Sequence, residues 1–380
     1  MLTRIGGSLF AGFDQHLCDL ERKGQRRRLT ARQGHDFASN DYLGLAGSPA
    51  LRTAVAEALA RGVPIGSGGS RLLRGNHPEH QMLEQEAADF FGSPTALFFS
   101  SGYTANSALL STLPQRGDLI IHDALIHASS HEGMRLSRAE ARRANHNDIQ
   151  SFADVLLDWR KSGGTGRPWL AVESLYSMEG DKAPLTDLLS VANQNDGFLI
   201  IDEAHATGVF GDSGRGLAEG FDGKDNVITV RTCGKALGCE GALICAPRAI
   251  TDFLINRGRG FIFSTAPSPL MAAAVRQALK TLQQEQDRRV RLHDFAAHAA
   301  ARLGPLGARC HGTQILPLIV GEAATAMELA GGLQEAGFDV RGIRPPTVPE
   351  GTSRLRISIT LNVDKAAISA LADTIGTLLA

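Results

Sequence analysis

The segment Phe198-Leu199-Ile200-Ile201-Asp202-Glu203-Ala204-His205 places four consecutive apolar residues directly before two carboxylates and, after one alanine, a histidine. A continuous apolar run is typical of a strand buried on both faces, as in a parallel sheet that helices cover on each side. In open α/β sheets, ligands bind at the carboxyl ends of such strands. The segment therefore predicts a covered α/β sheet with a ligand site beside Asp202 and His205.

Further apolar runs extend this sheet. Segments with helical patterning, such as Tyr103–Leu113 and Leu185–Gln194, separate them. This succession predicts an α/β fold whose central sheet is mostly parallel and carries helices on both faces. Besides Phe198–Ile201, the predicted strands are Ala96–Phe99, Leu119–His122, Trp169–Glu173, Val227–Val230 and Ala242–Cys245.

The pattern changes past about Pro267. A long amphipathic stretch, Ser268–Leu303, precedes shorter strands and helices, which together predict a smaller α+β domain. We therefore expect an N-terminal arm at residues 1–45, a large domain at residues 46–267 and a small C-terminal domain at residues 268–380. The later elements are strands Ile315–Val320 and Leu355–Ile359 and helices Ala324–Ala336 and Lys365–Leu379.

Composition narrows the classes of function. The 380 residues carry a net charge of -1, so no basic surplus favours a nucleic-acid partner. No apolar run reaches the ~18 residues of a membrane span. The five cysteines form no Cys-x-x-Cys pair, which favours reduced cytoplasmic thiols over disulfides or a metal site. The one basic cluster, Lys23 with Arg26–Arg28, suits either a solvated helix end or an anion-binding role.

A lysine follows another predicted strand. Lys235 closes the turn Thr232-Cys233-Gly234-Lys235 after Val227–Val230. A lysine among small residues at a strand end is poorly solvated, which lowers the pKa of its amine and favours imine formation with a carbonyl. At the same edge, Asp202 would stabilise a protonated pyridine nitrogen, and Ser177 offers a hydroxyl donor. Together these residues predict a pyridoxal phosphate site.

Some of these motifs also suit other functions. Asp-Glu-Ala-His also occurs in helicases, which need a Gly-x4-Gly-Lys-Ser/Thr phosphate loop. Here Ala236 follows Gly234-Lys235, and Thr229 stands where the first glycine belongs, which excludes a helicase. Gly66–Ser70 resembles a dinucleotide fingerprint but follows no apolar strand, so we interpret it as an active-site loop. The turn Ser100-Ser101-Gly102 suits either helix capping or a phosphate at a helix N-terminus.

Five motifs, in this order, resemble the α-oxoamine synthase family of fold-type I pyridoxal-phosphate enzymes. The resemblance runs from about residue 37 to the C-terminus. It implies the aspartate aminotransferase-like fold, pyridoxal 5'-phosphate as cofactor and a homodimer with shared active sites. The motifs are residues 38–45 (ASNDYLGL), Gly66–Ser70, Asp202–His205, Thr232–Lys235 and residues 344–356 (RPPTVPEGTSRLR).

The resemblance also implies roles at the cofactor. Lys235 would hold the cofactor as a Schiff base and transfer protons, Asp202 would pair with the pyridinium nitrogen, and His205 would contact the ring hydroxyl. His127 would stack on the ring beside the substrate. Contacts to other cofactor groups, chiefly the phosphate, would come from Gly102, Tyr103, Ser177 and Thr232, with Thr265 reaching the phosphate of the neighbouring subunit.

The resemblance extends to the substrates. Arg356 would bind the amino-acid carboxylate as a two-pronged partner. Asn40 and Thr347 would line the substrate pocket, and Arg26 would lie near the acyl substrate. Arg344–Pro349 resembles the branch that condenses L-alanine with a pimeloyl thioester, of CoA or acyl carrier protein, in biotin biosynthesis. A glycine-using branch of the family is the alternative, with an aminotransferase or a non-catalytic binding protein of the same fold as more distant ones.

Overall fold

The computed structural model describes residues 9–380, which form two compact units. The larger unit comprises residues 40–294 and 360–362. The smaller unit comprises residues 9–39, 295–359 and 363–380. Each unit contains β-structure of its own.

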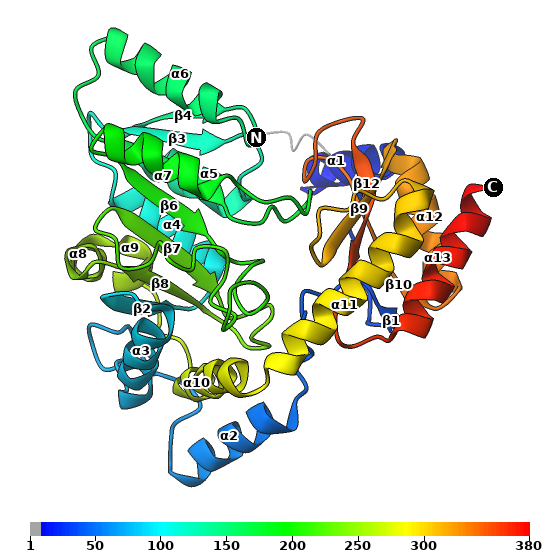
Figure 1. The fold of residues 1–380 in the computed structure, drawn as a ribbon, viewed down its shortest axis with the longest axis horizontal. Helices are drawn as coiled ribbons and strands as arrows, with labels where there is room; N and C mark the ends of the chain where they lie inside the picture. Colours follow the sequence, from blue (N-terminus) through cyan, green and yellow to red (C-terminus); the bar gives the residue numbers. More distant parts are fainter. Residues whose placement is uncertain (1–8) are drawn as a thin grey trace, which may run out of the picture. The chain divides into compact units, whose positions relative to one another are not determined.

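Within the described residues, a seven-stranded sheet forms the centre of the larger unit, in the order β2-β8-β7-β6-β5-β3-β4 (Figure 1). The pairs from β7 to β4 are parallel, whereas β8 runs antiparallel to both of its neighbours. All strands except β8 therefore end at the same edge of the sheet. The strands are β2 (Thr95–Phe99), β3 (Leu119–Asp123), β4 (Glu140–Ala144), β5 (Pro168–Glu173), β6 (Phe198–Asp202), β7 (Val227–Thr232) and β8 (Ala242–Ala246).

The predicted strands of this sheet are all present, but β4 was not predicted. It consists mostly of polar residues and lies at the edge of the sheet, paired with β3 alone. An edge strand of this kind need not bury both faces, and charged side chains are common on it. A search for apolar runs therefore could not reveal it.

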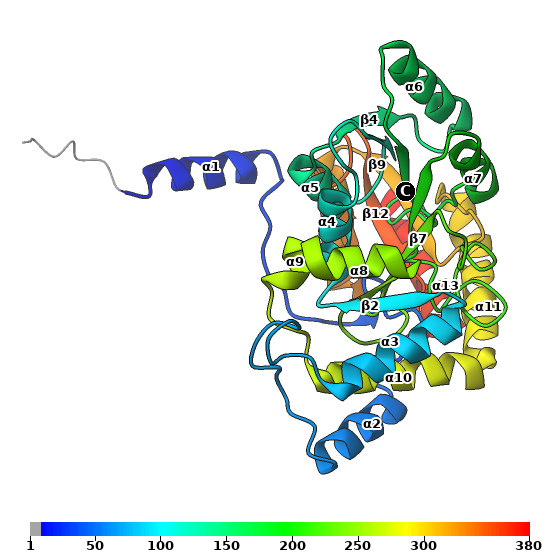
Figure 2. The same ribbon diagram turned by 90° about the vertical axis from the view of Figure 1, so that its left-hand side faces the viewer.

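Successive strand residues point to opposite faces, so the sheet carries an apolar core on each side. Ile120 and Ile200 belong to the core that α4, α5, α8 and α9 cover. Ile121 and Ile201 belong to the core under α6 and α7. Helices thus lie on both sides of the sheet, as the apolar runs predict (Figures 1 and 2). The helices are α2 (Pro49–Ala60), α3 (Pro78–Phe91), α4 (Gly102–Thr112), α5 (Ala128–Leu136), α6 (Ile149–Lys161), α7 (Leu185–Gln194), α8 (Arg248–Arg257), α9 (Arg259–Ile262) and α10 (Pro269–Gln284).

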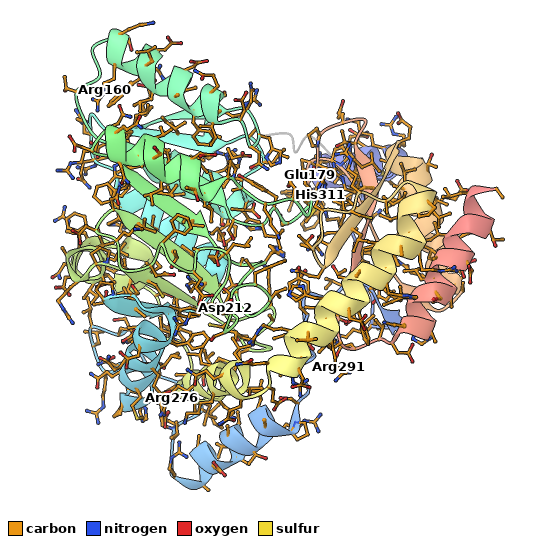
Figure 3. All side chains as sticks on the ribbon, viewed as in Figure 1. Arg160, Glu179, Asp212, Arg276, Arg291 and His311 are labelled. Carbon is orange, nitrogen blue, oxygen red and sulfur yellow. The ribbon has the colours of Figure 1, made fainter. Side chains whose placement is uncertain are left out.

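Helix α10 belongs to the larger unit, although its residues were expected in the small domain. Arg276 of α10, which is labelled in Figure 3, donates hydrogen bonds of 2.6 Å to Glu79 and to Glu86, both on α3. The amphipathic stretch is interrupted at Glu285, whose φ of -112° and ψ of 61° leave the helical region. Helix α10 belongs to this unit because it packs on α2 and α3, and helical periodicity does not specify such partners. The first segment of the unit ends at residue 294, inside α11 (Gln286–Leu303).

The smaller unit holds an antiparallel sheet of three strands in the order β11-β12-β9. The short strand β1 (His35–Asp36) pairs in parallel with β10 (Phe338–Asp339), and residues 9–39 of the expected N-terminal arm belong to this unit, whereas residues 40–45 belong to the larger one. Within residues 9–380, no helix is long and apolar enough to cross a membrane. The remaining elements are α1 (Ala11–Arg22), β9 (Ile315–Gly321), α12 (Ala323–Glu335), β11 (Arg341–Ile343), β12 (Ser353–Ser358) and α13 (Lys365–Leu379).

Candidate active site

Residues at the carboxyl ends of β2, β5, β6 and β7 line one cavity of about 440 Å³ in the larger unit. Strands that end at the same edge bring residues far apart in the sequence within reach of one ligand. The cavity combines an amine, carboxylates, two imidazoles and hydroxyl groups. Its lining residues are Ser100, Ser101, Gly102, Tyr103, Asn106, His127, Glu173, Asp202, Ala204, His205, Thr232, Gly234, Lys235, Cys239, Glu240 and Gly241.

The turn after β7 places Lys235 on the cavity wall. Two backbone hydrogen bonds of 2.8 Å shape this turn, from Cys233 N to Gly241 O and from Gly238 N to Lys235 O. Gly238 has a φ of 64°, and a Cβ there would lie 2.3 Å from the backbone nitrogen of Ala46. Only glycine fits this position, so close backbone packing determines where Lys235 lies.

The Asp202 carboxylate is buried and accepts two hydrogen bonds. Ala204 N donates to Oδ1 at 2.9 Å, and Asn106 Nδ2 donates to Oδ2 at 2.7 Å. These neutral donors hold the carboxylate in place but do not neutralise its charge, so a cationic group of a ligand would complement it. Asn106 was not predicted, and the only signal for it was a polar residue spaced three and four positions before Leu109 and Leu110, on the apolar face of α4.

A chain of hydrogen bonds orients the imidazole of His205. Tyr42 Oη lies 2.6 Å from His205 Nδ1 and donates to Asn40 Oδ1 at 3.0 Å. Since the single hydroxyl proton of Tyr42 goes to Asn40, His205 Nδ1 is the donor to Tyr42. The other ring nitrogen of a neutral His205, Nε2, is then an acceptor. Asn40 thus supports the site through Tyr42, whose role the sequence did not predict.

His127 caps helix α5 and lines the same cavity. Its Nδ1 accepts a hydrogen bond from Ser129 N at 3.2 Å and lies 2.8 Å from Ser129 Oγ. Burial lowers the pKa of His127 and outweighs the opposing effect of the Asp202 carboxylate. A neutral, planar imidazole on the cavity wall is suited to pack against a flat aromatic ligand.

The N-terminus of α4 contributes to the cavity as well. Ser101 caps the helix by accepting a hydrogen bond from Thr104 N at 3.1 Å, while the N–H groups of Gly102 and Tyr103 have no acceptor within the helix. A Cβ on Gly102 would lie 2.5 Å from Thr232 Cγ2, so glycine allows α4 and β7 to approach closely. The helix N-terminus offers N–H donors for a phosphate group. The Thr232 hydroxyl here donates to Ala204 O at 3.3 Å and would have to rotate to donate to a phosphate.

Glu173 is a cavity residue that the sequence analysis missed. It is 2% exposed and lies opposite Asp202 in the register of β5 and β6. Its Oε2 accepts a hydrogen bond from Ser177 N at 3.0 Å, whereas Oε1 has no hydrogen-bond partner among the described residues. Burial, reinforced by the Asp202 carboxylate, raises the pKa of Glu173 to about 8. The available signal was its place as the last residue of a predicted strand.

Two other predicted residues of the larger unit do not line this cavity. Ser177 is buried in the loop that follows β5, where its backbone N–H binds Glu173. Thr265 lies in a smaller hollow that Ser100 and Ser264 also line. Their proposed contacts with the cofactor remain predictions.

Three predicted substrate residues belong to the smaller unit. Arg356 lies on β12, is 6% exposed and donates to Ser358 Oγ at 2.6 Å. The Thr347 hydroxyl accepts a hydrogen bond from Arg27 at 3.1 Å. Arg26 forms an ion pair of 3.2 Å with Glu21. Their roles toward a substrate also remain predictions.

A model of the aminotransferase class I and II family matches residues 32–375. The chain belongs to this family. Among other members, the 8-amino-7-oxononanoate synthase from Chromobacterium violaceum is 42% identical over 340 residues, which cover 89% of this chain and 87% of the relative. The 8-amino-7-oxononanoate synthase from Geobacter sulfurreducens is 43% identical over 345 residues, with 88% and 87% covered.

Solved structures of family members share the fold. Serine palmitoyltransferase from S. paucimobilis with a bound PLP–myriocin aldimine has a TM-score of 0.87 and 27% identity, with 98% of each chain covered. The 8-amino-7-oxononanoate synthase from Francisella tularensis has a TM-score of 0.78 and 30% identity, with 91% of this chain and 98% of that one covered. These proteins are α-oxoamine synthases, so the predicted family and the fold-type I α/β fold are confirmed.

Proposed function

We propose that this chain has the activity of an 8-amino-7-oxononanoate synthase, the decarboxylative condensation of L-alanine with a pimeloyl thioester in biotin biosynthesis. The observation that carries the proposal is the convergence of Lys235, Asp202, His205 and His127 on one cavity. This cavity occurs in a chain that is 42% and 43% identical to proteins of that name over most of its length.

The residues of the cavity fit pyridoxal 5'-phosphate. Lys235 offers an amine for covalent attachment, and the buried charge of Asp202 calls for a cation such as a pyridinium nitrogen. The α4 N-terminus with Thr232 offers donors to the phosphate. When bound, the cofactor supplies an electron sink for the negative charge that develops at Cα of the amino acid.

With the cofactor bound, Lys235 would be the base that removes the Cα proton of alanine and later returns a proton. Asp202 keeps its negative charge next to the cation while Asn106 and Ala204 hold it in place. Neutral His127 would pack on the ring and contact the substrate. Overall, a bond forms between Cα of alanine and the acyl carbonyl carbon, the thiol carrier leaves, and the alanine carboxyl group leaves as CO2.

The substrate contacts are proposed from the family resemblance. β12 carries two buried arginines, Arg354 and Arg356, and the resemblance selects Arg356 for the alanine carboxylate. Arg356 has a guanidinium fork that matches a carboxylate with two parallel hydrogen bonds. Asn40 and Thr347 would line the pocket, and Arg26 would lie near the pimeloyl chain.

We also propose a cytoplasmic homodimer with shared active sites. Exposed side chains of Tyr103, Leu136, Phe253 and Phe263 line a hollow of about 850 Å³ on the larger unit. Clustered exposed apolar groups of this kind are typical of protein–protein contacts. In such a dimer Thr265 would reach the cofactor phosphate of the partner subunit.

All five cysteines are unpaired, which supports a reducing compartment.

A product assay tests the activity directly. The holoenzyme would receive alanine, glycine or serine with pimeloyl-CoA, and kcat/KM would be measured for each. A pocket that encloses the alanine methyl should prefer alanine over glycine by about 10- to 200-fold. Parallel reactions with pimeloyl-acyl carrier protein would identify the thiol carrier.

Other acyl donors serve as controls for the alternatives. Highest activity with glycine and acetyl-CoA or succinyl-CoA would assign the chain to a glycine-using branch. Highest activity with serine and palmitoyl-CoA would instead make it a serine palmitoyltransferase, the activity for which two of the solved structures are named. Amino-group exchange with a keto acid, without any thioester, would make it an aminotransferase.

A further inference from the structure

A histidine outside the cavity bridges two carboxylates. His146 lies between β4 and α6, and its side chain is largely buried. Its Nδ1 lies 2.9 Å from Asp123 Oδ1, and its Nε2 lies 2.9 Å from Asp181 Oδ2. The edge of the His146 ring also packs against Tyr176, with a centroid distance of 4.5 Å.

This geometry determines the protonation of His146. A neutral imidazole has one N–H donor, so one nitrogen would direct a lone pair at a carboxylate oxygen. Only the imidazolium donates to both carboxylates. Burial by itself lowers the pKa of His146, but the hydrogen bonds to Asp123 and Asp181 outweigh it and raise the pKa to about 10.

The first carboxylate shapes the turn that leads to His127. Asp123 is the last residue of β3 and is fully buried. Its Oδ1 accepts a hydrogen bond from Leu125 N at 2.8 Å, and its backbone carbonyl accepts one from Ile126 N at 3.3 Å. The next residue is His127, on the cavity wall. Movement of Asp123 would therefore displace His127.

The second carboxylate belongs to the loop that carries Ser177 and Glu179, the latter labelled in Figure 3. This loop folds back on itself through an antiparallel bridge between Leu175 and Lys182 and a hydrogen bond of 3.0 Å from Tyr176 N to Asp181 O. Ser177 N in turn binds Glu173 in the cavity. Movement of Asp181 would therefore displace the Ser177 turn.

The neighbouring residue strengthens the same link. Asn147 N donates to Asp123 Oδ2 at 2.8 Å, and its Nδ2 donates to Asp181 Oδ2 at 2.9 Å. Asn147 has a φ of 53°, a left-handed conformation in which asparagine is among the better tolerated residues. Both residues of the pair His146-Asn147 thus contact the same two carboxylates.

We propose that His146 is a positioning residue for the cofactor pocket, which clamps the turn before His127 to the loop that carries Ser177. The inference rests on the proposed cofactor roles of those two residues. His146 does not line the cavity, and it acts through Asp123 and Asp181. His146 is not among the residues proposed to contact the cofactor or the substrates.

The test compares cofactor binding in purified holoenzymes. His146→Gln keeps a polar side chain but removes the cation and one of the two donors. We expect the dissociation constant of pyridoxal phosphate to rise about tenfold, since residues linked in one ion-pair network couple by amounts of this order. The visible circular dichroism of bound cofactor should weaken, because its surroundings become less well ordered. Both readouts are taken at a temperature at which every variant is folded.

A double-mutant cycle tests whether His146 acts through Asp181. Asp181→Asn leaves the loop its polar side chain but removes the charge, and the double variant should be little worse than either single variant. Additive effects would contradict the clamp. His298→Gln is the matched control, because His298 bonds a neutral partner, Ser369 Oγ at 2.8 Å, in the smaller unit. It should leave cofactor affinity unchanged.

The outcomes separate this inference from the proposed function. Variants His127→Ala and Ser177→Ala test the cofactor roles proposed for these two residues. If they weaken cofactor binding while His146→Gln leaves the dissociation constant within about twofold and the circular dichroism intact, the clamp is refuted and the pocket stands. If neither of those pocket variants weakens binding, the proposed cofactor roles fail. Should His146→Gln not fold, Asp181→Asn and Asn147→Ala carry the same comparison.

Discussion

Two carboxylates occupy matching places at the ends of neighbouring strands but have different surroundings. Asp202 accepts hydrogen bonds from Ala204 and Asn106, which stabilise its charge. One oxygen of Glu173 has no hydrogen-bond partner within residues 9–380, and burial raises the pKa of Glu173 to about 8. Burial thus makes Glu173 the proton-holding carboxyl group of the pair, and enzymes use such differences in environment to assign acid and base roles.

At Asp202, the prediction concerns charge. Asp202→Asn keeps the shape and the acceptor oxygen but removes the anion, so the proposed pyridinium loses its partner. We expect kcat to fall by about two orders of magnitude or more, with a smaller loss of cofactor affinity. Steady-state kinetics of the loaded enzyme measure the effect. Turnover close to that of the wild type would show that Asp202 does not support the proposed chemistry.

At Glu173, the prediction concerns the stability of the apoprotein. Its pKa in the folded state, about 8, lies above the unfolded value of about 4.3. The stability linked to this proton is therefore fully present below about pH 4.3 and is lost as the pH rises toward about 8. Glu173→Gln mimics the protonated acid, so its Tm should exceed that of the wild type increasingly over this range. Glu350→Gln, at an exposed position, is the control. Parallel Tm profiles for wild type and Glu173→Gln would contradict the assignment.

At the scale of elements, α4 and β7 approach each other closely in the site. Ser101 caps α4, and Gly102 lets the helix N-terminus lie against Thr232. The turn Ser100-Ser101-Gly102 can therefore be both a helix cap and a phosphate site, the two interpretations that its sequence left open. It caps the helix and still presents N–H groups of the first turn toward the cavity.

Gly102→Ala tests this approach. A Cβ would lie 2.5 Å from Thr232 Cγ2, so the threonine or the helix must shift. Such overpacking costs about 1–3 kcal/mol, which would weaken pyridoxal phosphate binding by about five- to 150-fold if it falls on the site. Equilibrium titration of the apoprotein measures this. Gly331→Ala is the control, since it lies in α12 with no atom within 4 Å of the new Cβ. Equal affinity in both variants would refute a tight contact.

At the scale of the whole molecule, the proposed homodimer predicts complementation between defective subunits. In a mixed dimer of Lys235→Ala and Thr265→Ala chains, one site carries both changes, whereas the other has an intact Lys235 and an intact Thr265 from the partner. Co-refolded mixtures should therefore recover activity above either parent. Lys235→Ala mixed with Asp202→Asn, two changes within one cavity, should show no recovery. Equal behaviour of the two mixtures would place Thr265 outside any shared site.

The sequence by itself determined the fold class and the chemical centre of the site. Strands buried on both faces must be apolar at consecutive positions, so β6 and β7 were visible as runs. Asp202 at the end of β6 and Lys235 in the turn after β7 therefore had to lie at one edge of the sheet. The family motifs then indicated the cofactor. These signals are local, and a single sequence contains them.

Only the tertiary structure decided which distant residues complete the site. Asn106 lies on α4, Glu173 ends β5 and Tyr42 lies in a turn before α2. Each meets a residue that is far from it along the chain. The same holds for the unit to which α10 belongs and for the His146 bridge. Hydrophobic periodicity indicates that a side chain is buried but does not identify the residues that it packs against. Those residues are determined by how the elements pack in three dimensions.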